Sequence, residues 1–100
     1  MRITLEERNL VAKRYTTSPE AYTLYLKGRF HWNKRTGEGL KKGIDYFERA
    51  IQEDPQYGLA YSGLADCYNL LSLYSVLPPS KAMPKAKAAA RKALQITNVS

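Results

Sequence analysis

The stretch FERAIQEDPQYGLAYSGLADCY, residues 47–68, decides the fold. It is rich in Ala, Gly and Tyr, and its helical pattern stops once, at Asp54-Pro55, before it resumes. A proline here indicates either one kinked helix or two helices joined by a turn, because proline lacks the backbone N–H that a helix interior needs. Small residues recur on both sides, which favours two helices packed closely against each other.

The bulk composition predicts a single small globular domain. The chain has 100 residues, of which 44% are hydrophobic and 25% are charged, close to globular averages. No apolar run approaches the roughly 20 residues that span a bilayer, and the N-terminus lacks the apolar core of a secretory signal. One cysteine and one histidine can form neither an intrachain disulfide nor a zinc site. We therefore expect no metal or other cofactor, and a cytoplasmic location.

The formal charge of +7 is unevenly distributed along the chain. Residues 1–35 hold eight Lys and Arg against three acids, and residues 58–100 hold five against Asp66 alone. Residues 36–57 hold three against five acids. Basic flanks suit an acidic protein, nucleic acid or an anionic surface, and charge alone does not choose among them. Binding of nucleic acid or an acidic surface is therefore the alternative function.

Caps, apolar spacing and prolines together predict an all-α chain. The expected helices cover about 5–14, 19–34, 39–53, 58–73 and 85 onward. Thr4 and Glu7 form a capping box, and Ser18 with Pro19 opens the second helix. Three prolines in SVLPPSKAMP, residues 75–84, exclude regular helix there. No stretch keeps the period-2 alternation of a strand.

The predicted helices divide the chain into three parts. These are an N-terminal helix and linker over 1–17, a first hairpin over 18–55, and a second hairpin over 56–100 with a long inter-helix loop. The hairpins repeat each other, because YFERAIQEDP at 46–55 corresponds to AARKALQITN at 89–98. The number of residues that separates corresponding positions of the two hairpins differs between the start and the end of the hairpins. The difference falls in the inter-helix turns, where insertions are tolerated.

This pattern resembles the tetratricopeptide repeat (TPR) family, whose unit of about 34 residues has two antiparallel helices, small residues at the crossing and a closing proline. The matching positions are Leu24, Gly28, Gly43, Phe47, Ala50 and Pro55 in the first unit, and Tyr61, Leu64, Ala65, Tyr68, Ala86, Ala90 and Ala93 in the second. PEAYTLYLKGRFHWNKRT, residues 19–36, is similar to the repeat arrays of large multidomain bacterial regulators. The resemblance implies an α-α superhelix of two antiparallel hairpins plus an N-terminal helix. Its implied role is a protein–protein interaction scaffold.

The resemblance also implies a groove that binds a partner protein or peptide. Its residues are Tyr22, Tyr25, Arg29, Trp32 and Asn33 in the first unit, and Leu59, Ser62, Asp66, Asn69 and Leu70 in the second. Arg29 and Asn33 on one face can hold a carboxylate or a backbone amide, with Tyr25 as an amphipathic wall. The aromatic residues of this set also suit packing between the hairpins, and the two interpretations are compatible.

The sequence shows no catalytic motif, so we expect no enzymatic activity. Ser72, Ser75, His31 and Asp66 have no nucleophile elbow or phosphate-binding loop around them. Cys67 has no adjacent cation, which is typical of an inert core thiol. The cations near the first turn are Lys27, Arg29, Lys34, Arg35, Lys41 and Lys42. A solvated surface is favoured for them, since no nucleic-acid-binding signature accompanies them.

Two repeats are fewer than the three that a stable stack normally needs. We therefore expect either a fragment of a larger regulatory protein or self-association through the C-terminal helix. In a fragment, Leu94 and Ile96 would lack neighbours.

Overall fold

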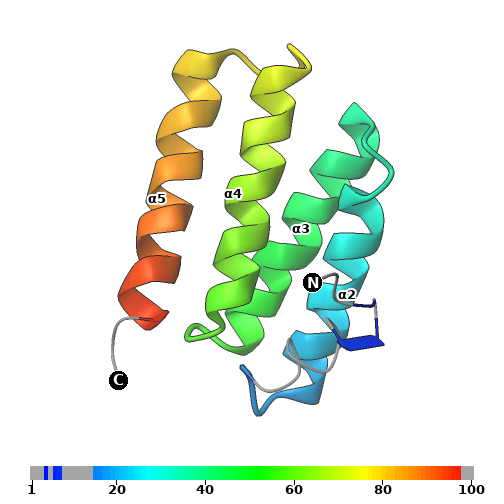
Figure 1. Ribbon diagram of the computed structural model, residues 1–100, viewed down its shortest axis with the longest axis vertical. Helices are drawn as coiled ribbons and strands as arrows, with labels where there is room; N and C mark the ends of the chain where they lie inside the picture. The colour runs from blue at the N-terminus through cyan, green and yellow to red at the C-terminus, as the bar shows by residue number, and fades with distance from the viewer. Residues whose placement is uncertain (1–3, 5, 8–14, 98–100) are drawn as a thin grey trace.

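The computed structural model describes residues 4, 6–7 and 15–97, and this part of the chain contains helices and no strand. The helices are α2 (Pro19–Trp32), α3 (Gly37–Glu53), α4 (Gly58–Leu73) and α5 (Pro79–Thr97). They stand side by side in chain order, from α2 in cyan to α5 in orange and red (Figure 1). Antiparallel pairs form between α2 and α3 and between α4 and α5, and α4 also packs against α3 and α2. The all-α prediction with two antiparallel hairpins is confirmed.

The break at Asp54-Pro55 separates two helices, as the sequence predicts. Helix α3 ends at Glu53 and α4 begins at Gly58. The Asp54 carboxylate accepts a hydrogen bond from the Gln56 backbone N–H at 3.0 Å, which fixes the turn between them. A kinked single helix is therefore excluded.

The predicted N-terminal caps are also present. Ser18 Oγ accepts from the Ala21 backbone N–H at 3.1 Å, and Pro19 occupies the first turn of α2. Thr4 Oγ1 accepts from the Glu7 N–H at 3.1 Å, and Glu7 Oε1 in turn accepts from the Thr4 N–H at 3.3 Å. These reciprocal bonds form the expected capping box. The rest of the helix predicted over 5–14 lies outside the described residues, apart from residues 6–7.

The first inter-helix turn lies two residues earlier than expected. The helices predicted over 19–34 and 39–53 leave residues 35–38 for the turn, but α2 ends at Trp32 and α3 already begins at Gly37. Thr36 Oγ1 caps α3 by accepting from the Gly39 N–H at 2.9 Å. A Cβ at Gly39 would lie 2.7 Å from the His31 carbonyl oxygen. Glycine at this position therefore lets the start of α3 lie against the end of α2, and the two glycines open the helix.

The prediction that residues 75–84 exclude helix is wrong. Helix α5 begins at Pro79, and Pro84 lies inside it. The Pro78 carbonyl accepts from the N–H groups of Lys81 and Ala82 at 2.9 Å each, so the helix starts well before the expected residue 85. Pro79 suits the first position, and the carbonyl that Pro84 leaves unpaired belongs to the exposed Ser80. The predicted long inter-helix loop is therefore only residues 74–78.

Phe47 of α3 is the centre of the core. Its side chain is fully buried between a glycine of α2 and a glycine of α4. A Cβ at Gly28 would lie 2.6 Å from the ring, and a Cβ at Gly63 would lie 2.5 Å from it, closer than real Cβ atoms approach. The absence of a side chain at both positions therefore allows α2, α3 and α4 to meet around one phenyl ring.

Other small residues hold the remaining helix contacts. A Cβ at Gly43 would lie 3.2 Å from Cys67 Sγ, so α3 and α4 also approach closely there. On α5 the buried residues form a stripe of methyl groups: Ala82, Ala86, Ala89 and Ala93. Of the small residues predicted at the crossings, Ala90 is exposed and its neighbour Ala89 is buried instead, whereas the others are buried: Gly28, Gly43, Ala50, Ala65, Ala86 and Ala93. The sequence prediction missed Gly63.

Tyr57 is the tyrosine of the second hairpin that packs in the core. It is fully buried, whereas Tyr61, a matching position of the second unit, is only partly buried and donates its hydroxyl to the Pro55 carbonyl at 3.2 Å. The ring centroids of Tyr25 and Tyr57 are 5.4 Å apart, and those of Tyr25 and Phe47 are 5.7 Å apart. These three rings form one aromatic cluster in the core.

We predict that Gly63→Ala destabilises the fold by about 1–3 kcal/mol, because the new methyl group overlaps a ring that has no free space to enter. Gly58→Ala is the matched control. Its Cβ would be no nearer than 3.5 Å to Ile96 Cγ2, so it should keep or raise stability, as Ala favours helix over Gly. Urea unfolding followed by circular dichroism measures both, and equal effects of the two changes would contradict the role of Phe47.

Candidate functional site

The two halves of the predicted partner-binding groove lie on adjacent helices. The first half is carried by α2 and by Asn33, the C-cap residue of α2, and the second half is carried by α4. Arg29 Nη1 donates to Asp66 Oδ2 at 2.9 Å and joins them. We call this surface the α2–α4 face; its residues are Tyr22, Tyr25, Arg29, Trp32, Asn33, Leu59, Ser62, Asp66, Asn69 and Leu70. Its role in binding stays a prediction.

Arg29 is the residue with the most contacts on the α2–α4 face. Besides its bond to Asp66, its Nε donates to the Tyr25 hydroxyl at 3.0 Å. The Arg29 side chain is 26% exposed and that of Asp66 is 43% exposed. Burial lowers the pKa of Arg29, but Tyr25 and Asp66 outweigh it and raise that pKa overall. A guanidinium has five N–H groups, so Arg29 stays cationic and keeps donors for a further acceptor.

Trp32 lies within reach of two guanidinium groups. The central carbon of Arg29 is 5.1 Å from the indole centroid, and that of Arg35 is 4.3 Å from it. Arg35 has a φ of 55°, and this left-handed residue turns the chain just after α2. Trp32 Nε1 is buried and has no hydrogen-bond partner in the described part of the chain. The result is a cation–π cluster at one end of the face, and Arg35 was missing from the predicted groove.

Two exposed amides complete the polar part of the face. Asn33 lies one helical turn from Arg29, and Asn69 lies one turn from Asp66. Neither amide makes a side-chain hydrogen bond to another described residue. An amide offers both a donor and an acceptor, which is the pair that a peptide backbone requires. Ser62 and Tyr22 are partly buried and lie nearer the N-terminal ends of α4 and α2.

Tyr25 packs mainly in the core, and little of its side chain is available as a wall of the predicted groove. Its side chain is 8% exposed and its ring packs in the aromatic cluster with Phe47 and Tyr57. Its hydroxyl accepts the hydrogen bond from Arg29. Tyr25 therefore orients the guanidinium of Arg29 from the core side, and a ligand on this face would contact Arg29 rather than the tyrosine ring.

The basic residues near the first turn are spread over several aromatic rings. Lys34 Nζ lies 4.8 Å from the Phe30 centroid, and Lys27 Nζ lies 5.9 Å from the Tyr46 centroid. Lys42 pairs with Glu38 at 3.4 Å. Lys34 and Lys42 both lie close enough to His31 to lower its pKa, so part of this basic set is near the His31–Tyr46 stack.

His31 has a packing role on the outer side of α2. Its ring stacks on Tyr46 with centroids 5.3 Å apart and an angle of 6° between the planes. Burial lowers the pKa of His31, and the nearby charges of Lys34 and Lys42 lower it further. The histidine is therefore neutral at pH 7.

We predict that Arg29→Ala destabilises the fold more than Asp66→Ala does, by about 1–2 kcal/mol against about 0.5–1 kcal/mol. Both changes remove a half-exposed ion pair, but only the arginine also loses its hydrogen bond to Tyr25 and its ring contacts. Arg49→Ala is the control, because its pair with Asp45 at 3.6 Å is exposed and local to α3. Denaturant unfolding of the two single variants and the double variant gives the coupling between Arg29 and Asp66. A coupling of zero would contradict the link between the hairpins.

Cys67 is a core thiol, as the sequence predicts. It is fully buried below Gly43. Burial raises its pKa to about 12, the charge of Arg29 opposes this shift and that of Asp66 adds to it. A protonated thiol without access to solvent is a poor nucleophile.

We predict that Cys67 reacts with Ellman's reagent at pH 8 only when the fold opens. Its folded thiolate fraction is lower by about a thousandfold than that of a free thiol. Its raised pKa also predicts that stability falls as the pH rises above 9.0, the ordinary value, because the unfolded thiol then ionises and the folded one does not. The unfolded chain in guanidinium chloride is the control, and rapid labelling of the native protein would show that the thiol is accessible.

Comparisons with protein-family models, with curated proteins and with solved structures gave no match. Within the described ranges, no three His, Cys, Asp or Glu side chains lie close enough together to bind a metal ion. The helices described there are too short or too polar to cross a membrane. The α2–α4 face is the candidate site that the Arg29 contacts define.

Proposed function

We propose that this chain is a TPR-type protein–protein interaction module. In this proposal the two hairpins are successive units of an α-solenoid, and the α2–α4 face binds a peptide segment of a partner protein. The observation that carries the proposal is the Arg29–Asp66 ion pair, because it joins the two halves of a groove expected from the sequence. The module acts as a scaffold and has no enzymatic activity of its own.

The packing of the hairpins supports a repeat architecture. Both hairpins place small buried residues where their helices meet, Gly28 and Gly43 in the first and Ala65 and Ala86 in the second. Helix α3 lies between the first helices of the two hairpins and contacts both. Equivalent helices α2 and α4 also touch each other, which is the neighbour relation that stacked units require.

The polar groups of the face fit an extended peptide that carries a carboxylate. The remaining N–H groups of Arg29 can bind that carboxylate, and Arg35 adds a second cation nearby. The amides of Asn33 and Asn69 can each bind a backbone N–H and C=O. Asp66, which is 43% exposed, can accept a hydrogen bond from a further backbone N–H. Recognition would then depend on the backbone and on one acidic side chain.

We predict that Asn33→Ala with Asn69→Ala weakens the binding of peptides selected from a displayed random library by about thirtyfold, since each lost amide is worth about 1 kcal/mol and a tenfold change is about 1.4 kcal/mol. The control is Gln52→Ala with Gln95→Ala, which removes two exposed amides from α3 and α5. The unfolding midpoint should not change in either variant. Selected peptides that bind both variants equally, or a library that yields no binder, would contradict the proposal.

Nucleic-acid or acidic-surface binding through the basic flanks remains the alternative. It would depend mainly on the cations of α5, because Arg29, Arg35 and Lys34 near the first turn already lie over aromatic rings. The same protein titrated with duplex RNA at rising salt distinguishes the two. A steep loss of affinity with salt would favour nucleic acid.

A further inference from the structure

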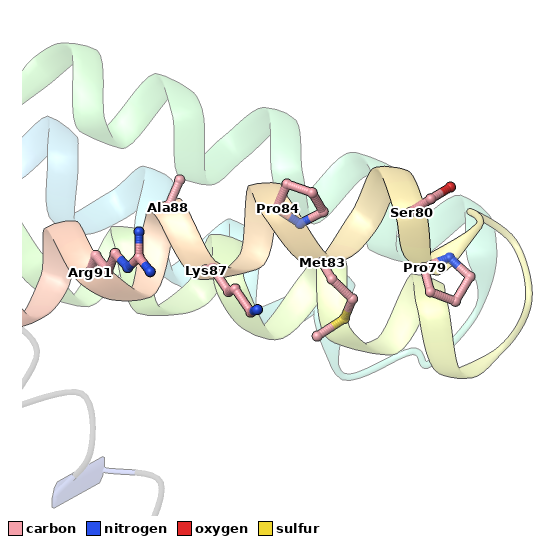
Figure 2. A pocket seen from close by; sticks show the side chains of 7 residues that line it. All are labelled: Pro79, Ser80, Met83, Pro84, Lys87, Ala88 and Arg91. Carbon is pink, nitrogen blue, oxygen red and sulfur yellow. The ribbon is translucent and has the colours of Figure 1, made fainter.

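Helix α5 carries a groove on an outer surface that the other helices leave open. It has a volume of about 530 Å³ and is open to solvent, and all of its lining residues belong to α5 and are exposed. One wall is the row Met83, Lys87 and Arg91, and the other is the row Ser80, Pro84 and Ala88. Figure 2 shows the two rows along the helix surface. This α5 groove shares no residue with the α2–α4 face.

The shape of the α5 groove suits another helix. Each wall is a row of residues four apart, and such rows form the ridges of an α-helix surface. The space between two neighbouring ridges is the place that receives a ridge of a second helix. Ser80 and Ala88 are small, so that wall allows close approach, and Met83 and Pro84 provide apolar contact along the groove.

The charge of α5 defines the chemistry of that helix. The segment from Pro79 to Thr97 contains five Lys and Arg and no Asp or Glu. Lys87 and Arg91 stand one turn apart on a single wall, and neither forms an ion pair with an acid in the described part of the chain. Carboxylates one turn apart on a partner helix would match this spacing.

We infer that the α5 groove binds an amphipathic, acidic helix of a partner protein. An apolar ridge of the partner enters the groove, and its acidic side chains pair with Lys87 and Arg91. A second copy of this chain fits less well, because two α5 surfaces without a carboxylate would bring like charges together. Nucleic acid also fits less well, because only one wall of the groove is cationic and the other is small and apolar.

The test measures anisotropy of a fluorescein-labelled helical peptide of about 20 residues, a length that is long enough to fold. The peptide carries Glu at four-residue spacing beside a row of Leu and Ala. The protein variant is Lys87→Glu with Arg91→Glu. The control variant is Lys81→Glu with Lys92→Glu, which makes the same charge change on the same helix outside the groove. Ala88→Phe fills the groove without changing charge, and it replaces an exposed residue.

We expect the groove variant and Ala88→Phe to weaken peptide binding by about tenfold, and the control variant to weaken it by less than about threefold. A peptide of the same composition in scrambled order should bind about tenfold more weakly, because it has no apolar ridge. Equal binding of both peptides, equal losses in both charge variants, or tighter binding of duplex RNA would overturn the inference. So would a dimer in sedimentation that Ala88→Phe dissociates, since the groove would then hold a second copy.

Discussion

The contact of Phe47 with two glycines is the constraint on which the rest of the structure depends. Its ring belongs to α3 of the first hairpin, but it occupies space that side chains at Gly28 and Gly63 would otherwise fill. Three helices therefore approach one ring, and the second hairpin is held against the first by the interior of α3. A buried phenyl group contributes a large apolar area, so one residue supplies much of the energy that joins the hairpins.

The geometry of the α2–α4 face follows from this contact. Arg29 is the residue after Gly28, and Asp66 lies one helical turn after Gly63. Because both glycines lie against the Phe47 ring, the side chains of Arg29 and Asp66 come within hydrogen-bond distance at the surface. The close approach of α2 and α4 to Phe47 thus forms both the buried core around this ring and the polar cluster at the surface. A change in the helix spacing at Phe47 would alter both.

Several elements of the fold could be predicted from the sequence because local chemistry determines them. The bounds of α4, the cap at Ser18 and the turn at Asp54-Pro55 depend on residues that are near one another in the chain. Gly63 could not be predicted as a contact, because a glycine inside a helix only signals lower helix propensity until the ring opposite is known. Pro84 was misread for a similar reason: its effect depends on where the helix begins.

The residues of the candidate site were predictable as two sets of helical positions, but their contacts were not. Spacing along α2 and α4 shows which side chains share a face. It does not show that Tyr25 is in the core, because the burial of Tyr25 depends on the neighbouring hairpin. It also does not show that the Arg35 side chain lies over Trp32, because that contact depends on the left-handed backbone of Arg35, a residue that is not glycine. Tyr57 and Tyr61 are one turn apart, and the sequence alone does not show which of them is buried.

The methyl stripe of α5 has a consequence for the order in which the fold opens. The buried residues of α5 at its seam with α4 are four alanines, whose side chains are too short to interlock with the neighbouring helix, and Ile96 adds a contact at Gly58. Such a seam gives close contact but little apolar area and little resistance to sliding along the helix axis. Among the four helices described here, we therefore expect α5 to detach at the lowest free energy, while the three helices around the phenyl ring stay together as one cooperative unit.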